Sequence, residues 1–555
     1  MTEIKLRPWQ AECTIKAISW LKRKKDKNFL INAAPGAGKT ICAAVIAKQL
    51  IDDDLIDRVI VIAPRKTVVR QWATEFKTVT GRSMLQITGA DEEPEDYGVD
   101  LCATWTAVQG LLDGLQAVCK NYRTLVICDE HHHAAVEAAW GNGADGAFKQ
   151  AKYTIILTGT PIRSDGKESV WLAYDTNGEI EHPEAGTYAL SYGTAVDLDY
   201  CRPITFHRHE AKFSVQLSGG ENIKVSGLDE TVISQPLKRI RGLQQALDYY
   251  KLACTPKFLS NGKADLASYQ ASLLESAIAK LNDLRHRMPD AAGLVIAPNI
   301  PVAEYMAEIL EQLDGEKPTL VHNNVANSDG KIAAFRSSGK KWIVSVAMIS
   351  EGVDIPRLRV LAYLPNAQTE LSFRQAMGRV VRNDGPLDDT RAYVVMPTHG
   401  VFETYARRVE QEMSPAKLKE TKVLTSKVCA SCGAECALDE KACHECDSDF
   451  PIKTARMKVC ECCQGLNPIG AQSCQTCSTS FQHDFEITLD DALRTGAIIR
   501  GMDLNEGEIV ESEAMRDTFR RDVLASGDQT LIKIIRQIPE ESYSRLARIL
   551  DDARR

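Results

Sequence analysis

The segment that most limits how this chain can fold is NFLINAAPGAGKTICAAVIAKQL, residues 28–50. An apolar strand is followed by a glycine-bearing turn and then by a helical pattern, the order found where helices cover a parallel sheet. The same order returns further along the chain, and each apolar run is continuous rather than alternating. Continuous runs are typical of strands buried on both faces, so the sequence predicts an α/β protein built on parallel sheets.

Two sets of such strands follow one another, which predicts two α/β domains. The expected strands lie in residues 28–32, 58–64, 122–130 and 153–161, then 292–298, 317–322, 341–347, 359–364 and 391–396. Residues 164–290 are mixed, and we interpret them as a linker and helical insertion leading into the second domain. The expected domains are 1–200, 201–420, a cysteine-rich block over 425–482 and an acidic, partly helical region over 483–555.

The charge of the chain is unevenly distributed. Its 555 residues carry a formal net charge of -8, which argues against coating nucleic acid by bulk positive charge. Residues 1–424 hold 51 basic and 52 acidic residues, whereas residues 484–555 hold 11 and 16. No apolar run approaches the roughly 18–20 residues that span a bilayer, and MTEIKLRPWQ lacks the apolar core of a signal peptide. We therefore expect a cytoplasmic protein with no membrane partner.

Small residues stand where the first strand meets its helix. The loop reads Ala33-Ala34-Pro35-Gly36-Ala37-Gly38-Lys39-Thr40, the A-x-x-G-x-G-K-T variant of a phosphate-binding pattern. Backbone N–H groups of such a loop converge on phosphate oxygens at a helix N-terminus. The pattern predicts a nucleoside triphosphate site in which Lys39 reaches the β- and γ-phosphates and Thr40 holds Mg²⁺.

Two carboxylates end the strand at residues 122–130. Asp129 is suited to hold Mg²⁺ through water, and Glu130 is suited to polarise the attacking water as a general base. Three histidines, His131, His132 and His133, follow directly. They leave two interpretations open, a sensor of the nucleotide or a transition-metal site, and their place after Asp-Glu at a strand end favours the sensor.

Ten of the 17 cysteines crowd between Cys429 and Cys477. Two C-x-x-C pairs separated by ten residues occur twice, with a period of 31: Cys429, Cys432, Cys443 and Cys446, then Cys460, Cys463, Cys474 and Cys477. Four thiolates satisfy tetrahedral Zn²⁺ with no open position, so the spacing predicts two structural zinc ribbons. Cys436 and Cys462 are left over, and an iron–sulfur or redox site is the alternative.

Five strings in this order resemble the motifs of superfamily 2 helicases of the DExH form. They are AAPGAGKT, CDEHHH, LTGTP (157–161), SEGVD (350–354) and QAMGRVVR (375–382). The resemblance covers residues 1–415 and implies two RecA-like domains that close on ATP. It also implies that His132 couples the ATP site to residues 158–161, and that Gly352 and Asp354 link the nucleotide to a bound strand.

The last of these strings predicts charge from the second domain. Gln375, Arg379 and Arg382 fall at i, i+4 and i+7, on one face of a helix. Guanidinium groups suit the charge that develops on a transferred phosphoryl group, so Arg379 and Arg382 are candidate arginine fingers. An exposed basic helix face is the plainer alternative.

The resemblance extends to base and strand contacts. Arg7-Pro8-Trp9-Gln10 resembles the segment that reads adenine in this superfamily, where Gln10 offers a donor and an acceptor. Arg65, Thr104 and Thr106 are candidate phosphate contacts for a nucleic acid lying across both domains, and such contacts do not read sequence. The alternative for Arg65 is a solvated helix face.

The core followed by paired ribbons resembles RadD-type bacterial DNA-repair helicases. That resemblance implies an ATP-dependent DNA helicase or translocase in replication, recombination or repair, phage-related roles included, acting on single-stranded or branched DNA. One alternative is an ATP-switched scaffold that uses nucleic acid as its activator and recruits a protein through the ribbons or acidic tail. Another is the motor of a restriction or defence system, whose nuclease would be a partner.

Overall fold

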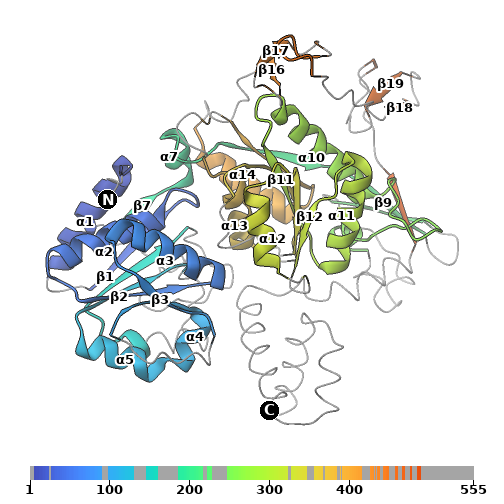
Figure 1. Cartoon of the computed structure of the whole chain (residues 1–555). Coiled ribbons are helices and arrows are strands. Elements are labelled where there is room, and N and C mark those ends of the chain that lie inside the picture. Colours follow the sequence, from blue (N-terminus) through green and yellow to red (C-terminus); the bar gives the residue numbers. More distant parts are fainter. Residues whose placement is uncertain are drawn as a thin grey trace, which may run out of the picture.

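The computed structural model describes a two-domain core and the cysteine-rich block beyond it (Figure 1). The described residues are 5–23, 27–89, 98–130, 146–159, 186–216, 222–227, 247–322, 325, 327–346, 355–366, 369–383, 388, 390–414, 426–429, 432, 434–437, 440, 442–448, 457–459, 465–468, 476–477 and 484–488. No helix within these ranges is both long and apolar enough to cross a membrane.

The first domain is a seven-stranded sheet in which all pairs are parallel. In order across the sheet, the strands are β3 (Met84–Ile87), β4 (Asp100–Thr104), β2 (Arg58–Ala63), β5 (Thr124–Cys128), β6 (Tyr153–Thr158), β1 (Asn28–Ala33) and β7 (Thr187–Leu190). The central strands β5 and β6 are buried at every position. This confirms the prediction drawn from the continuous apolar runs.

Short helices accompany this sheet. They are α1 (Pro8–Lys22), α2 (Lys39–Asp52), α3 (Lys66–Thr80), α4 (Trp105–Gly110), α5 (Leu112–Asn121) and α7 (Tyr192–Asp197). Helix α3 ends at Gly81, whose φ of 76° is a left-handed conformation that favours glycine. Its apolar side, which includes Trp72 and Phe76, is buried.

The second domain is a six-stranded sheet, again parallel throughout. Its order is β12 (Thr319–Val321), β13 (Trp342–Ser345), β11 (Ala292–Ile296), β14 (Leu358–Tyr363), β15 (Ala392–Pro397) and β8 (Ile204–His209). The associated helices are α9 (Tyr249–Ala253), α10 (Tyr269–Arg285), α11 (Ile300–Asp314), α12 (Ser328–Arg336), α13 (Glu370–Val380) and α14 (Gly400–Glu412). Residues 198–203 cross from the first domain to β8.

Helix α11 shows how sequence fixes these boundaries. The Asn299 side chain accepts a hydrogen bond from the backbone N–H of Val302, and Pro301 stands in the first turn. The helix ends at Gly315, with φ of 73°.

A third, small sheet ties the far C-terminal side of the chain to the second domain. Its strands are β10 (Asn222–Ser226), β9 (Lys212–Gln216) and β20 (Asp484–Thr488). Strand β20 pairs in parallel with β9, and Phe485 packs against Phe213 and Tyr269, with ring centroids 6.0 and 5.5 Å apart. The chain therefore returns to the core after the cysteine block.

The cysteine block contains two short antiparallel hairpins, which lie apart from the large sheets in Figure 1. They are β16 (Ser426–Val428) with β17 (Glu435–Ala437), and β18 (Met457–Val459) with β19 (Leu466–Pro468).

Candidate nucleotide site and cysteine cluster

The phosphate-binding loop joins β1 to the N-terminus of α2. Gly36 and Gly38 have φ of 82° and 97°, which only glycine adopts without strain. Lys39 begins α2 and is 9% exposed, and its Nζ donates to the backbone oxygen of Ala33 at 2.9 Å. Thr40 is the next residue of the helix. The structure therefore places the glycine-bearing loop directly before the N-terminus of α2, and the binding of phosphates there stays a prediction.

Burial and the neighbouring carboxylates affect the pKa of Lys39 in opposite directions. Burial lowers the pKa of Lys39, and the carboxylates of Glu130 and Asp129 oppose that shift. Gly159, which follows β6, approaches the same amine, because a Cβ on Gly159 would lie 2.9 Å from Nζ. The lysine is thus enclosed by the ends of three neighbouring strands, β1, β5 and β6.

Asp129 and Glu130 stand at the C-terminal end of β5. Asp129 is buried, and its Oδ2 accepts a hydrogen bond from Trp72 Nε1 at 2.7 Å. Burial, followed by repulsion from Glu130, raises the pKa of Asp129 to about 6. Glu130 has φ of 48°, a left-handed conformation unusual for a non-glycine residue. The backbone at Glu130 therefore departs from the extended conformation of β5.

Helix α13 of the second domain packs on the phosphate loop. A Cβ on Gly378 would lie 2.6 Å from Pro35 Cβ, and a Cβ on Gly36 would lie 2.8 Å from Arg382 Cγ. Gln375 and Arg379, on the same helix, are 9% and 7% exposed. An exposed basic helix face, the plainer alternative, therefore does not describe α13. Arg382 lies beyond the end of α13, so the prediction that it shares one helical face with Gln375 and Arg379 is wrong. It reaches the loop from the segment after the helix, where it forms a bridge with Cys201.

A mostly apolar cavity of about 220 Å³ lies between the domains beside this contact. Pro35 and Gly159 line it from the first domain, and Met377 and Gly378 line it from α13.

Arg7 and Gln10 contact the loop from the outside. The Arg7 guanidinium donates to the Ala37 oxygen at 3.0 Å, and Gln10 Nε2 donates to the Gly38 oxygen at 3.0 Å. Gln10 Oε1 accepts from the Arg7 backbone N–H at 2.8 Å. Both polar ends of the Gln10 amide therefore already have protein partners, and a contact with adenine stays a prediction.

The residues predicted to contact a nucleic-acid strand differ in accessibility. Arg65 stands at the N-terminus of α3. Thr104 is 3% exposed, and its hydroxyl accepts a hydrogen bond from the Ala107 N–H at the start of α4. A phosphate contact by Thr104 would require this turn to open. The side chain of Thr106 lies outside the described residues.

Three further candidate site residues of the core also lie outside the described residues, namely His132, Gly352 and Asp354. The roles expected for them stay predictions. Residues that sequence reasoning missed are Trp72, which fixes the Asp129 carboxylate, and Cys201, whose Sγ donates to the Pro35 oxygen at 3.3 Å. Neither belongs to a motif that a local pattern would single out.

Four cysteines at and after the first hairpin form a cluster. The Sγ atoms of Cys429, Cys432, Cys443 and Cys446 all lie within 4.8 Å of one another. Two of the separations, Cys429 to Cys446 and Cys432 to Cys443, are 3.6 Å. A tetrahedron with zinc–sulfur bonds of about 2.3 Å has sulfur atoms about 3.8 Å apart. The donor set therefore fits Zn²⁺.

The second set of four is described only in part. Cys477 is exposed, whereas Cys460, Cys463 and Cys474 lie outside the described residues. Cys436, left over by the repeat, is buried with its Sγ 3.6 Å from that of Cys443.

Comparison with protein-family models finds two matches. A model described as type III restriction enzyme, res subunit, matches residues 3–163, and one described as helicase conserved C-terminal domain matches residues 276–384. The first match lies within the first domain and the second match lies within the second domain. The parallel-sheet α/β architecture of these two domains matches the RecA-like helicase fold.

Comparison with individual proteins also finds relatives of this chain. An uncharacterized protein of Mycobacterium leprae (strain TN) is 30% identical over 394 residues, which is 70% of this chain and 61% of that protein. The chain thus matches less than two thirds of that relative. A DNA 3'-5' translocase of Sulfurisphaera tokodaii is 23% identical over 392 residues, covering 68% of this chain and 79% of the translocase.

Among solved structures, the fragment of a putative HsdR subunit of a type I restriction enzyme from Vibrio vulnificus YJ016 aligns with a TM-score of 0.49 and 16% identity. It covers 72% of this chain and 65% of that one. A likeness this weak does not bear on function.

Proposed function

We propose that this chain is a DNA-stimulated ATPase that translocates on or unwinds DNA in replication, recombination or repair. The observation that carries the proposal is the seating of Arg382, from the second domain, on Gly36 of the phosphate loop. An ATP site shared by two domains changes when the domains move, which couples hydrolysis to motion along a strand.

The residues of this site have distinct roles in the proposal. The loop from Pro35 to Gly38 binds the phosphates through backbone N–H groups, and Lys39 contributes its charge there. Mg²⁺, held by Thr40 and Asp129, would neutralise charge on the phosphate oxygens. Glu130 orients the attacking water and accepts its proton, and Arg379 and Arg382 stabilise negative charge as it develops.

The remaining expected residues complete the coupling. Gln375 lies on the same buried helix as Arg379. His132, Gly352 and Asp354 would connect the ATP site to the bound strand, and Arg7 and Gln10 would favour adenine.

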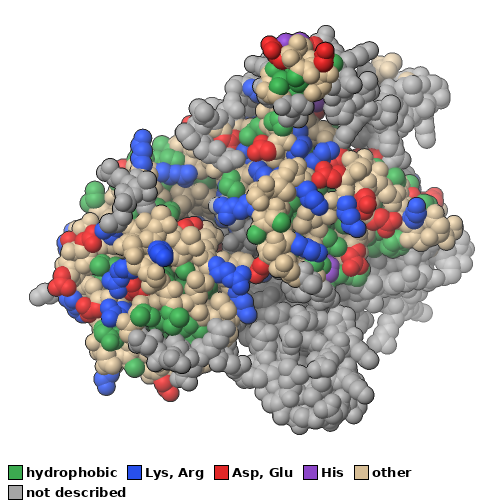
Figure 2. All heavy atoms as spheres, in the orientation of Figure 1, with side chains coloured by type: hydrophobic (Ala, Val, Ile, Leu, Met, Phe, Trp, Pro, Cys, Tyr) green, Lys and Arg blue, Asp and Glu red, His purple; other side chains and the backbone are tan. Residues whose placement is uncertain are grey.

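Several features support DNA as the polymer. The similarity to a DNA translocase extends over 68% of this chain. Figure 2 shows Lys and Arg side chains at the facing edges of the two α/β domains in this view. Arg70 on α3 forms a 3.2 Å ion pair with Asp329 on α12, across the domain boundary. Both side chains are about half exposed, so a phosphate can compete for Arg70.

The cysteine block is proposed to hold two structural Zn²⁺ ions and to select a DNA structure or a protein partner. The compact four-thiolate cluster supports the first ion, and the repeat in the sequence supports the second. A ribbon this small depends on its metal to fold. A helicase-like core followed by this cysteine block is the basis of the proposed likeness to RadD-type DNA-repair helicases.

The test is ATP turnover by the full chain with single-stranded DNA, duplex DNA, forked DNA and RNA, with Lys39→Ala as the inactive control. The proposal expects stimulation by DNA, together with ATP-dependent fork unwinding or displacement of a triplex-forming strand. Stimulation without either movement would favour the ATP-switched scaffold.

A second candidate is the motor of a restriction system, which the description of the family model over residues 3–163 favours. Such a motor would show DNA cleavage only when a nuclease partner is added. Unwinding of forks by the chain alone, with no such partner, favours the repair assignment.

A further inference from the structure

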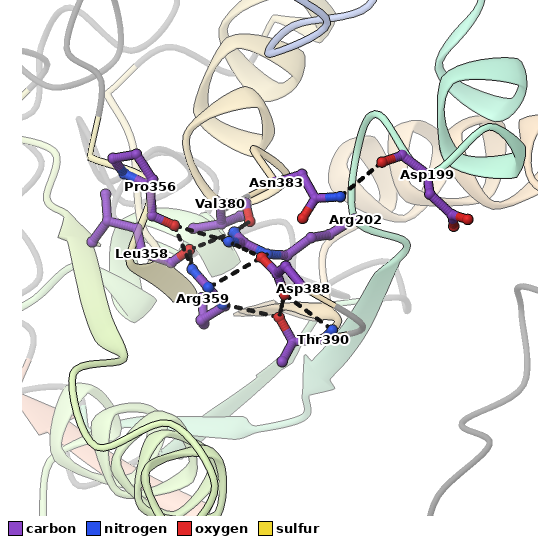
Figure 3. A network of polar contacts seen from close by, with 9 residues as sticks. All are labelled: Asp199, Arg202, Pro356, Leu358, Arg359, Val380, Asn383, Asp388 and Thr390. Carbon is purple, nitrogen blue, oxygen red and sulfur yellow. Dashed lines mark hydrogen bonds and ion pairs between the residues drawn. The ribbon is translucent and has the colours of Figure 1, made fainter. Parts of the chain in front are cut away.

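A buried arginine in the segment between the two domains forms the centre of a polar network (Figure 3). Residues 198–203 follow α7 of the first domain and lead into β8 of the second. Arg202 lies in this segment, and its side chain is 0% exposed. A fully buried arginine is rare because burial removes the hydration of its charge. The partners of Arg202 therefore indicate which parts of the protein it joins.

Every N–H group of the Arg202 guanidinium has an acceptor. Nε donates to Asp388 Oδ2 at 2.7 Å, and Nη2 contacts the same carboxylate oxygen at 2.5 Å. The remaining donors reach three backbone oxygens, those of Leu358, Val380 and Pro356, at 3.0, 2.9 and 2.9 Å. Five donors in a rigid fork are a property of arginine that lysine lacks.

Arg202 contacts the end of α13 through both its side chain and its backbone. Val380 is its last residue, and the Val381 oxygen accepts from the Arg202 backbone N–H at 2.7 Å. Carbonyl groups at a helix C-terminus have no partner within the helix, so Arg202 supplies the missing donors. Asn383, just beyond, donates from Nδ2 to the Asp199 oxygen at 2.7 Å. The helix end and the crossing segment are therefore joined at three points.

The Asp388 carboxylate is shared with a second buried arginine. Arg359, on β14, approaches the same Oδ2 at 3.1 Å and donates through Nε to Thr390 at 3.0 Å. Burial alone would raise the pKa of Asp388, but the hydrogen bond and charge of Arg202, with the charge of Arg359, lower it to about 2. The carboxylate is therefore ionised at neutral pH.

The network lies directly beside the proposed ATP chemistry. Cys201, next to Arg202, forms an antiparallel bridge with Arg382 and donates to the Pro35 oxygen of the phosphate loop. Pro356, on the other side, follows closely after residues 350–354. One guanidinium thus joins the domain crossing, the end of the arginine-bearing helix and the segment after SEGVD.

We propose that Arg202 and Asp388 are positioning residues that hold Arg379 and Arg382 in register with the phosphate loop. This inference rests on the proposed function of the ATP site. A buried ion pair adds little net stability compared with apolar residues of the same size, but it fixes one arrangement of its partners. Its loss should therefore lower the rate of hydrolysis more than the binding of ATP.

The test compares Arg202→Lys and Asp388→Asn with Arg357→Lys in the full chain. Arg357 is a matched control, because it is 6% exposed and donates to backbone oxygens of Asp290, Lys340 and Phe335, away from α13. We expect both network variants to lose about ten- to 100-fold in kcat for DNA-stimulated ATP hydrolysis, with KM for ATP changed by less than about threefold. Arg357→Lys should lower the unfolding temperature similarly and keep kcat.

Asn383→Ala keeps the test decisive if the buried variants do not fold. Asn383 is partly exposed, and its replacement removes one of the three joints, so kcat should fall about two- to threefold with the fold intact. Unchanged kcat in a folded Arg202→Lys, or in Asn383→Ala when the buried variants do not fold, overturns the inference. An equal loss of kcat in Arg357→Lys overturns it as well. A wild-type chain without ATPase activity would instead refute the proposed function.

Discussion

Gly36 of the phosphate loop faces Arg382 of the second domain so closely that a Cβ on Gly36 would lie 2.8 Å from the Arg382 Cγ. The contact joins the residue that must be small for a phosphate to approach with the residue proposed to stabilise charge on that phosphate. The proposed ATP site therefore lies between two domains, at two residues that are more than 300 positions apart in the sequence.

Replacing Gly36 by alanine should therefore stop turnover. The substitution combines a φ of 82° with the close approach of Arg382, so both the loop and the position of the arginine must shift. Gly81→Ala is the matched control, since Gly81 has a φ of 76° with nothing within 4 Å. We expect Gly81→Ala to lose about 1 kcal/mol of stability and keep its ATPase rate, and Gly36→Ala to lose at least about tenfold in rate. Equal rates for the two variants would contradict the account.

Glu130→Gln should bind ATP and not hydrolyse it. The change removes the proposed base and leaves the backbone of the phosphate loop intact, so kcat should fall by at least about 100-fold. Fluorescent-nucleotide binding and single-turnover hydrolysis separate the two steps. Asp113→Asn, on α5 of the same domain, is the control and should retain both. Near-normal turnover by Glu130→Gln would show that another group activates the water.

The cysteine block should hold two Zn²⁺ ions per chain, which elemental analysis of the purified protein measures. Cys443→Ser should reduce the content to one, because it removes a sulfur of the compact cluster. Cys436→Ser is the control: it lies 3.6 Å from Cys443 but outside the repeat, so two ions should remain. A value of one in the wild-type chain, or iron in place of zinc, would refute paired zinc ribbons.

Strand β20 should stabilise the second domain. Phe485 packs against Phe213 and Tyr269, so Phe485→Ala should cost about 1–3 kcal/mol of unfolding free energy in denaturant titration. Glu486→Ala, at the neighbouring exposed position, should cost less than about 0.5 kcal/mol. If the two variants were equally stable, the pairing of β20 with β9 would not persist in solution.

The pairing of β20 with β9 also shows what the sequence could not reveal. The continuous apolar strands and the glycine loop predicted both parallel sheets, because those patterns are local. The pairing of residues 484–488 with residues 212–216 is not local, and no pattern in either segment predicts the other as its partner. A fragment ending near residue 420 would lose this strand, so the role of the cysteine block is better tested in a chain that keeps residues 484–488.

The residues of the candidate site also differ in whether a local pattern could predict them. Lys39, Asp129, Glu130 and Arg382 were expected together because each belongs to a string that resembles a helicase motif, and the structure brings them close to one another. Arg202 was not expected, since CRP at residues 201–203 is an ordinary tripeptide. Its importance arises from partners more than 150 residues away in the chain, Pro356, Val380 and Asp388.

We propose that Arg382 acts in hydrolysis across the domain boundary, and the DNA-stimulated ATPase rate of Arg382→Ala beside the wild-type chain tests this. We expect kcat to fall by about 10³-fold with little change in ATP affinity, because the guanidinium stabilises charge that exists only in the transition state. An unchanged kcat, or a loss confined to ATP affinity, would contradict it.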